Sequence, residues 1–273
     1  MPEGPEIRQA ADKIAQIIES KTVEHVEVGL TSLKPFVSKL KGRKVTEVQT
    51  HGKSMITHFD NDLSIYSHNQ LYGIWMTSKR GHYPNTNRQL RLALHTASDS
   101  ALLYSASDIS VWHKEDLHKH PLLRKLGPDI MDTTLQVDDI LVRLSSDKFK
   151  NRALASLYLD QQFLAGVGNY LRSEILFAAG INPTLKPKQL NDAQLRALAA
   201  ATLSVARQSY NTGGYTISDE RLDKIDTNTA DYESERFMVF DRDTLPCRTC
   251  STHIQRATLN ARRIYWCPSC QPI

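Results

Sequence analysis

Residues 247–270 read CRTCSTHIQRATLNARRIYWCPSC and contain all four cysteines of the 273-residue chain. Each C-x-x-C pair presents two thiolates on one tight turn, and two such turns can close a tetrahedron around Zn²⁺. The spacing of the pairs lies inside the pattern of zinc sites. Two disulfides or a redox C-x-x-C pair are the alternatives, although no thioredoxin-like βαβ pattern surrounds either pair. We therefore expect one structural Zn²⁺ ion with four ligands, namely Cys247, Cys250, Cys267 and Cys270.

The residues between the cysteine pairs predict a β-hairpin, with strands HIQRATL and IYW joined by the turn NARR. Four cysteines leave no coordination position for water, so the metal is expected to replace a core rather than to catalyse. Arg262 and Arg263 lie at the expected tip. A braced hairpin with arginines at its tip suits a DNA groove or phosphates. A zinc ribbon that packs or binds another protein is the alternative.

Composition places few limits on the partner. The chain is 40% hydrophobic and 23% charged, with a net charge of +4, so it permits a polyanionic partner without demanding one. The length favours two domains, or two and a small module. The start lacks the pattern of a secretory signal, and the longest apolar run, ALAAATLSVA, is too short to span a bilayer. We expect a soluble cytoplasmic protein.

The hydrophobic periodicity changes twice along the rest of the chain. An amphipathic helix is predicted over 5–21, and short runs of period two over 23–112 predict a β-sandwich or flattened barrel. After Gly127 the pattern becomes helical. Four helices are expected, over 134–146, 151–166, 169–180 and 191–210, with glycines at positions 166, 168 and 180 where helices should end and Asn191 as an N-cap.

The predicted fold class is α+β and multidomain, with an N-terminal β-sandwich flanked by helices, a helical domain and a zinc-finger hairpin. The polar stretch that follows Tyr210 has little periodicity and is expected to be a long loop or linker. The expected divisions are 1–126 for the β-sandwich domain, 127–212 for the helical domain, 213–236 for the polar loop and 237–271 for the zinc finger.

The first residues, MPEGPE, combine two prolines and two glutamates. Pro5 and Glu6 suit the start of a helix. If Met1 is removed, Pro2 carries a secondary amine, and a terminal amine titrates at about 7.7–8.0. A neutral amine can attack a sugar carbon and form an iminium, and Glu3 could donate or relay a proton. The alternative is a proline that only stiffens the arm.

Several motifs now stand in one order, namely PEGPE, HGKSMITHF, YSHNQLYGIW, GVGNYLRSEIL and the cysteine hairpin. Together they resemble the formamidopyrimidine-DNA glycosylase / endonuclease VIII family of base-excision repair enzymes, over essentially the whole chain and most strongly its bacterial endonuclease VIII branch. The resemblance implies a helix–two-turn–helix unit in the helical domain. It also implies that Pro2 attacks C1′ of a damaged nucleotide, that Glu3 supplies a proton as the sugar opens, and that Lys53 assists β-elimination.

The resemblance implies further site residues. Arg262 would contact phosphates and assist δ-elimination, with Arg263 as the alternative. Gln70, Leu71 and Tyr72 match the triplet that fills the hole left by an extruded nucleotide, although such a triplet can also be a solvent loop. A phosphate is expected at the free N–H groups of the helix that Asn169 opens.

The resemblance leaves alternatives for the roles of three further residues. Lys125 stands where the family has an arginine, and the adjacent Arg124 is the alternative for that phosphate contact. Glu6 and Glu174 match positions near the active centre, and the alternative for both is a helix-surface carboxylate. The polar loop after Tyr210 is longer than usual, which leaves the base preference open.

The predicted function is removal of oxidised pyrimidines from damaged double-stranded DNA, followed by strand cleavage through β,δ-elimination. The enzyme is expected to be a monomer in the bacterial cytoplasm, without a membrane partner. One competing reading is the sister branch that acts on oxidised purines, and Gly4 and the Gln-Leu-Tyr triplet argue against it. The other is a non-catalytic zinc-ribbon DNA-binding protein, which would not need Pro2, Glu3 and Lys53 together.

Overall fold

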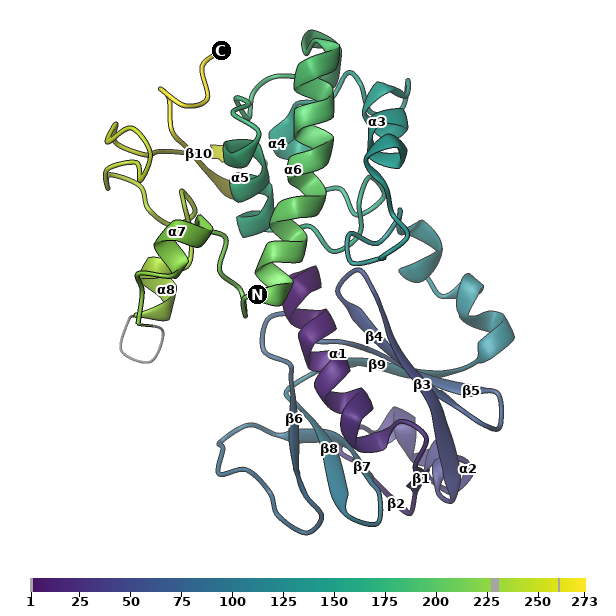
Figure 1. Ribbon diagram of the computed structural model, residues 1–273. Helices are drawn as coiled ribbons and strands as arrows, with labels where there is room; N and C mark the ends of the chain where they lie inside the picture. The colour runs from purple at the N-terminus through teal and green to yellow at the C-terminus, as the bar shows by residue number, and fades with distance from the viewer. Residues whose placement is uncertain (1, 227–230, 260) are drawn as a thin grey trace. The chain divides into compact units, whose positions relative to one another are not determined.

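The computed structural model describes residues 2–226, 231–259 and 261–273 (Figure 1). Met1 lies outside this range. The chain forms two compact units. The first comprises Pro2 and Glu6–Lys125, and the second comprises Glu3–Pro5 and Leu126–Ile273. The finer division of the second unit at residues 212 and 236 stays a prediction.

The first unit is built on two antiparallel sheets. One has the order β1-β3-β4-β5-β9 and the other the order β2-β7-β8-β6. The strands are β1 (Thr22–Val23), β2 (His25–Val28), β3 (Arg43–His51), β4 (Ser54–Phe59), β5 (Leu63–His68), β6 (Ile74–Lys79), β7 (Leu90–His95), β8 (Asp99–Tyr104) and β9 (Asp108–His113). Strands β4 and β5 pair directly as an antiparallel hairpin.

Helix α1 (Gly4–Ile18) supplies one apolar face to the core of the first unit. Ala11, Ile14 and Ile18 are buried together with side chains of both sheets. Their three- and four-residue spacing is the pattern that predicted the helix. The remaining elements of this unit are short, namely η1 (Thr31–Phe36), α2 (Val37–Leu40), η2 (Lys114–Lys119) and η3 (Leu123–Lys125).

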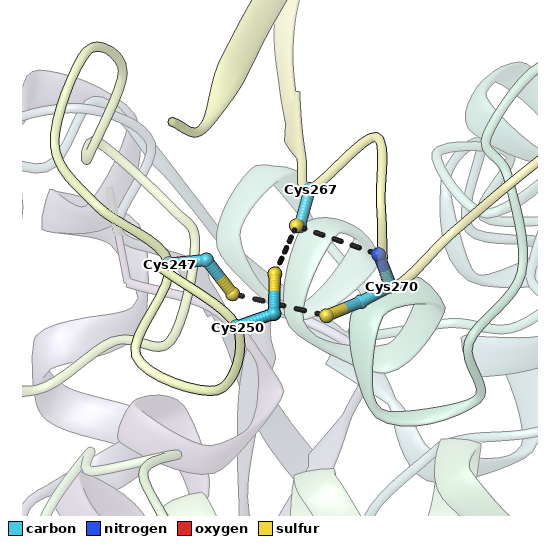
Figure 2. A group of neighbouring side chains, drawn as sticks. All are labelled: Cys247, Cys250, Cys267 and Cys270. Atoms are coloured by element: carbon cyan, nitrogen blue, oxygen red, sulfur yellow. Dashed lines mark hydrogen bonds between the residues drawn. The ribbon is translucent and has the colours of Figure 1, made fainter. Parts of the chain in front are cut away.

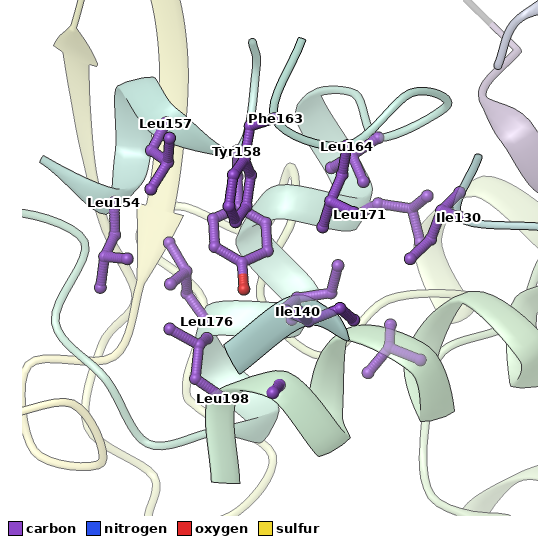
Figure 3. Packing of buried hydrophobic residues seen from close by; sticks show 14 of the residues in the cluster. Ile130, Ile140, Leu154, Leu157, Tyr158, Phe163, Leu164, Leu171, Leu176 and Leu198 are labelled. Atoms are coloured by element: carbon purple, nitrogen blue, oxygen red, sulfur yellow. The ribbon is translucent and has the colours of Figure 1, made fainter. Parts of the chain in front are cut away.

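The second unit contains the helical core shown in Figure 3. Its helices are α3 (Val137–Ser145), α4 (Leu154–Leu157), α5 (Asn169–Ala178), η4 (Pro187–Gln189) and α6 (Asp192–Asn211). Helix α6 packs against α3 and α5. Asn191 is its N-cap as predicted, since the side chain accepts a hydrogen bond from Gln194 N at 2.9 Å. Gly168, in contrast, caps the start of α5 rather than the end of a helix.

The predicted helix over 151–166 is wrong beyond a single turn. Only Leu154–Leu157 is helical, and the chain then turns so that Phe163 N donates to Asp160 O at 2.8 Å. Arg143 Nε holds the turn by donating to Phe163 O at 2.8 Å. Apolar side chains before and after the turn are buried in the same core (Figure 3). The apolar residues of this segment therefore mark a buried turn and not one face of a helix.

The polar stretch after α6 contains two one-turn helices, α7 (Asp219–Leu222) and α8 (Tyr232–Glu235), while residues 227–230 lie outside the described range. Glu235 accepts hydrogen bonds from Arg221 at 3.1 Å and from Arg248 at 2.8 Å. These ion pairs join α7 and α8 to the first C-x-x-C turn.

The cysteine hairpin is present, but its strands differ from the expectation. They are β10 (Gln255–Leu259) and β11 (Arg262–Trp266), and Leu259 pairs with Arg262. Arg262 and Arg263 are therefore the first residues of a strand and do not lie in the turn. Asn260, part of the predicted turn, lies outside the described residues. Within the part of the chain that the structure describes, no helix is long and apolar enough to cross a membrane.

Candidate functional site

The four cysteines converge from the two C-x-x-C turns (Figure 2). Their sulfur atoms all lie within 4.8 Å of one another, with Cys247 Sγ 3.9 Å from Cys270 Sγ and Cys250 Sγ 3.4 Å from Cys267 Sγ. A disulfide would need a distance of about 2.0 Å between its two sulfur atoms. Hydrogen bonds from Thr252 lower the pKa of the Cys250 thiol to about 6, whereas burial raises the pKa of the Cys267 and Cys270 thiols. The four sulfurs can hold one metal ion.

Glu3 is bound to the N-terminus of α5. Its carboxylate accepts hydrogen bonds from Gly168 N at 2.7 Å, Tyr170 N at 2.9 Å and Leu171 N at 3.3 Å, and the side chain is buried. The helix dipole stabilises a carboxylate at this position. The expectation that these N–H groups are free for a phosphate is therefore wrong for these three, because Glu3 already occupies them.

Arg172 is a site residue that the sequence analysis missed. It is fully buried on α5 and donates to Ala155 O at 2.7 Å, Asn169 Oδ1 at 2.6 Å and Arg263 O at 2.6 Å. Burial lowers the pKa of its guanidinium to about 10, and the Glu3 charge opposes this change. Its position was a signal, because Arg172 shares a helical face with the apolar Ile175 and Leu176.

The two hairpin arginines have different surroundings. Both are exposed at the start of β11. The charge of Arg262 also lowers the pKa of Arg172, which places Arg262 near the N-terminal end of α5. Arg263 instead forms a side-chain hydrogen bond that lowers the pKa of Tyr265. Within the second unit, Glu3, Asn169 and Arg262 therefore gather around Arg172.

Glu174 is a buried anchor and not a surface carboxylate. It accepts hydrogen bonds from Thr216 Oγ1 at 2.7 Å, Met238 N at 2.8 Å, Val239 N at 2.9 Å and Phe240 N at 2.8 Å. Burial raises its pKa, and these four donors oppose the rise. The carboxylate fixes α5 to the polar loop and to the chain that enters the cysteine hairpin.

In the first unit, Pro2 and Glu6 line a pocket of about 660 Å³. Its other walls include Asn69, Leu71 and Tyr72. Glu6 is half-buried, whereas Leu71 is 60% exposed and Tyr72 is 71% exposed. We call Gln70, Leu71 and Tyr72 the wedge triplet. The structure thus brings Pro2, the expected nucleophile, together with two members of this triplet.

Lys53 lies at the tip of a two-residue hairpin between β3 and β4, where His51 pairs with Ser54. Gly52 has a φ of +63°, which suits the first position of a type II′ turn. The Lys53 charge lowers the pKa of His68, the last residue of β5. Ser54, the residue after Lys53, pairs with His68, so Lys53 lies beside the end of β5. Farther along the chain, Arg124 and Lys125 are both exposed in η3.

Comparison with protein families matches two parts of the chain. The formamidopyrimidine-DNA glycosylase N-terminal domain matches residues 1–107, and the formamidopyrimidine-DNA glycosylase H2TH domain matches residues 126–221. Endonuclease 8 of Escherichia coli K12 is 48% identical over 271 residues, which cover 99% of this chain and 100% of that protein. Endonuclease 8 of Salmonella dublin is 46% identical with the same coverage.

Solved structures show the same fold. Lactococcus lactis Fpg (MutM) bound to DNA with an oxidised pyrimidine has a TM-score of 0.81 at 18% identity, and each chain is covered to 100%. The complex of Lactococcus lactis Fpg with DNA that contains an abasic site has a TM-score of 0.80 at 19% identity, with 99% of this chain and 100% of that chain covered. The predicted α+β fold is confirmed. The chain belongs to the formamidopyrimidine-DNA glycosylase family, whose members are DNA glycosylases and AP lyases of base-excision repair.

Proposed function

We propose that this chain is a bifunctional DNA glycosylase and AP lyase that acts on damaged double-stranded DNA with Pro2 as nucleophile. The observation that carries the proposal is the carboxylate of Glu3, the residue after Pro2, which three N–H groups at the N-terminus of α5 hold in place. A proline that only stiffened an arm would not need a buried charged neighbour bound to a helix terminus. Burial of a carboxylate is costly unless the group is hydrogen-bonded, so this arrangement points to a use.

The chemistry follows from a secondary amine beside a carboxylate. The Pro2 nitrogen attacks C1′, and the bond from C1′ to the base breaks with its electron pair leaving on the base. Because N–H donors favour the ionised form of Glu3, this group first takes the Pro2 proton and then passes it to the ring oxygen as the sugar opens. The resulting iminium acidifies the C2′ proton, so the 3′ phosphate leaves first and the 5′ phosphate follows.

The wedge triplet explains how the lesion reaches Pro2. An enzyme that attacks C1′ must extrude the nucleotide and fill the vacated space. Leu71 and Tyr72 are 60% and 71% exposed, which is unusual for two consecutive large apolar side chains on a loop. Insertion between bases would bury both side chains, and Gln70 can form hydrogen bonds with the unpaired base.

Cations are proposed to stabilise the phosphates that leave. Lys53 would assist β-elimination from the first unit, and Arg262 would assist δ-elimination from the second. The charge of Arg262 near Arg172 supports it over Arg263, whose side chain hydrogen-bonds Tyr265. Asn169 and Lys125 are proposed phosphate contacts, although Asn169 Oδ1 already accepts a hydrogen bond from Arg172, so its Nδ2–H groups would serve.

We assign one structural Zn²⁺ ion to the four cysteines. All four donors are thiols, two of them buried, and a tetrahedral S₄ set suits Zn²⁺. When bound, the ion would brace the turns that carry β10 and β11. Oxidised pyrimidines are the proposed lesion class, since the relatives of 46–48% identity are named Endonuclease 8. A monomeric state and a cytoplasmic location stay predictions.

Borohydride trapping tests the proposal. The protein is incubated with sodium borohydride and duplexes that contain an oxidised pyrimidine, 8-oxoguanine or no damage, after mass spectrometry has established whether Met1 is absent. We expect a covalent adduct, formed faster on the oxidised pyrimidine. A matched protein with extra residues before Pro2, which blocks the amine, should form none. Absence of an adduct with Pro2 exposed would overturn the enzymatic reading, and faster trapping on 8-oxoguanine would overturn the lesion class.

A further inference from the structure

Residues outside the wedge triplet fix the conformation of its first residue, Gln70. Gln70 has a φ of +52°, in the left-handed region that a non-glycine residue adopts only when its surroundings fix it. Its backbone N–H donates to His68 Nδ1 at 2.9 Å, and Ser107 Oγ donates to its side-chain Oε1 at 2.8 Å. The loop is closed by Gly73 N, which donates to Asn69 O at 2.7 Å.

Glycine is required at position 73. A Cβ there would lie 2.5 Å from Asn69 O and 2.7 Å from Asn69 Cα, both backbone atoms. The exposed Leu71 and Tyr72 thus extend from a short loop that closes on itself, and Gln70 is the second residue after β5 ends at His68. The conformation of Gln70 therefore sets the direction of the wedge.

The hydrogen bond to Gln70 defines the state of His68. A backbone N–H can only donate, so Nδ1 must carry a lone pair, and the imidazole must be neutral with its proton on Nε2. Three features bear on this state. Burial lowers the pKa of His68 most, Lys53 lowers it further, and Asp108, its cross-strand partner on β9, raises it. Lys53 therefore favours the form of His68 that can hold Gln70.

We propose that His68 is a positioning residue, which fixes Gln70 through Nδ1 and thereby presents the wedge of Leu71 and Tyr72. This inference rests on the proposed function for its consequence, but the contact itself does not. His68 lies between two parts of the machinery, since it neighbours Lys53 on one side and bonds Gln70 on the other. Its role is to keep the wedge formed before DNA arrives, so that extrusion does not also have to order the loop.

Three substitutions separate the two ring nitrogens. In His68→Asn the amide oxygen takes the place of Nδ1 and can accept from Gln70, in His68→Gln the amide reaches the place of Nε2, and His68→Ala provides neither. We expect His68→Asn to keep near-native trapping rates on damaged duplex. His68→Gln and His68→Ala should be slower by about three- to tenfold, the effect of one net hydrogen bond.

The substrate supplies the second discriminating readout. Single-stranded DNA with an abasic site has no stack to open and no void to fill, so a wedge defect should disappear on it. We expect the deficit of His68→Ala to be confined to duplex DNA, as for Leu71→Ala. An equal deficit on both substrates, or rescue by Gln rather than Asn, would overturn the proposal and assign His68 to a direct contact through Nε2.

Two controls complete the test. His58 is a buried histidine of β4 whose Nδ1 lies 2.7 Å from Ser64 Oγ, and His58→Ala measures the cost of losing a sheet histidine elsewhere in the same sheet. Hydrogen exchange at the Gln70 amide needs no activity. It should accelerate in His68→Ala and stay near-native in His68→Asn. Unchanged exchange in both variants would overturn the proposal even if the protein processes DNA, whereas inactivity of the native protein with the exchange pattern present would overturn only the enzymatic function.

Discussion

At the scale of single residues, Glu3 shows how a short motif acquires a role. The sequence places a glutamate beside Pro2, and the structure adds three N–H donors from α5. These bonds, which an exposed side chain would not have, fix the position of the carboxylate. Position 3 is thus defined by its hydrogen bonds as well as by its adjacency to Pro2.

Glu3→Gln should separate the two chemical steps. A glutamine keeps the shape but cannot carry the Pro2 proton to the ring oxygen, so base release should fall by about 10²–10⁴-fold. Strand cleavage at a preformed abasic site should fall much less, because that sugar already opens without the enzyme. Rates on both substrates are measured under single-turnover conditions.

Glu6→Gln is the matched control, since it makes the same carboxylate-to-amide change at a half-buried residue of the pocket wall, in the first turn of α1. An equal loss of both steps in Glu3→Gln would show that the side chain acts by fixing Pro2 and not by moving a proton.

Residue patterns predicted the cysteine ligands but missed Arg172. The spacing of the cysteines alone indicates a metal site. The contacts of Arg172 instead depend on the carbonyl groups of residues 155 and 263, which are distant from it in the sequence. Only its place on an apolar helical face hinted at burial. The same limit applies to Glu174, whose partners at positions 216 and 238–240 no local pattern reveals.

At the scale of elements, α6 was predictable because Asn191 caps its start and its apolar residues recur at helical spacing. Apolar residues recur at the same spacing in α5, although every residue from Tyr170 to Leu176 is buried. The structure of segment 151–166 was not predictable, since its apolar residues have a helical spacing in the sequence but are buried around a turn. The register of the hairpin could not be predicted from the sequence either. A turn over 260–263 and a turn that ends before Arg262 are both compatible with the same residues. The consequence is chemical, as Arg262 and Arg263 point to opposite faces of a strand.

Cys267→Ala should disorder the hairpin while leaving the first unit folded. Structural Zn²⁺ in small zinc-finger peptides contributes about 10–16 kcal/mol of apparent binding energy, far more than a few buried side chains replace. We expect loss of the metal, a weaker affinity for DNA and loss of trapping, with the strand signal of the two sheets retained. Metal analysis, circular dichroism and DNA binding are measured on the same sample.

Thr249→Ala is the control, because Thr249 is an exposed residue of the other C-x-x-C turn, which Cys247 and Cys250 form. If Cys267→Ala lost its metal and kept full trapping, the hairpin would have no part in catalysis.

Element η3 presents Arg124 and Lys125 next to each other, and salt dependence can distinguish them. A side chain that neutralises one phosphate contributes about 0.9 to the slope of log K against log salt. We expect Lys125→Ala to reduce the slope by this amount and Arg124→Ala to leave it unchanged. Lys119→Ala is the control, since Lys119 is an exposed cation of η2 that pairs with Asp116 at 2.6 Å. The reverse result for the first two variants would assign the contact to Arg124.

At the scale of the whole molecule, the chain crosses between the two units within its first six residues. Pro2 belongs to the first unit, Glu3–Pro5 to the second, and the chain returns to the first unit at Glu6. No periodicity or composition could predict this division, because it depends on which unit buries each residue. Periodicity and the family resemblance predicted the overall architecture, whereas the contacts that divide the arm come only from the structure.

The titrating groups are also divided unequally between the units. Nine of the ten histidines lie between positions 25 and 120, and His253 is the other. Burial is the largest cause of a lowered pKa at four of them, namely His58, His68, His95 and His120. A histidine with a lowered pKa in the folded state is protonated first in the unfolded chain. Its contribution to stability is therefore complete above about 6.5, the ordinary value, and is lost as the pH falls through the lower folded value.

The first unit should thus lose stability on acidification before the second does. Each of the four histidines reduces the free energy of unfolding by at most about 1.4 kcal/mol per pH unit in this window. Trp75 and Trp112 report on the first unit and Trp266 on the second, so Trp266→Phe and the double variant Trp75→Phe/Trp112→Phe give single-unit probes. We expect the melting temperature at pH 5.5, relative to pH 8, to fall more in Trp266→Phe, and His58→Gln to lessen that fall. An equal fall in both reporters would mean that carboxylates spread over both units, rather than buried histidines of the first, govern the response to acid.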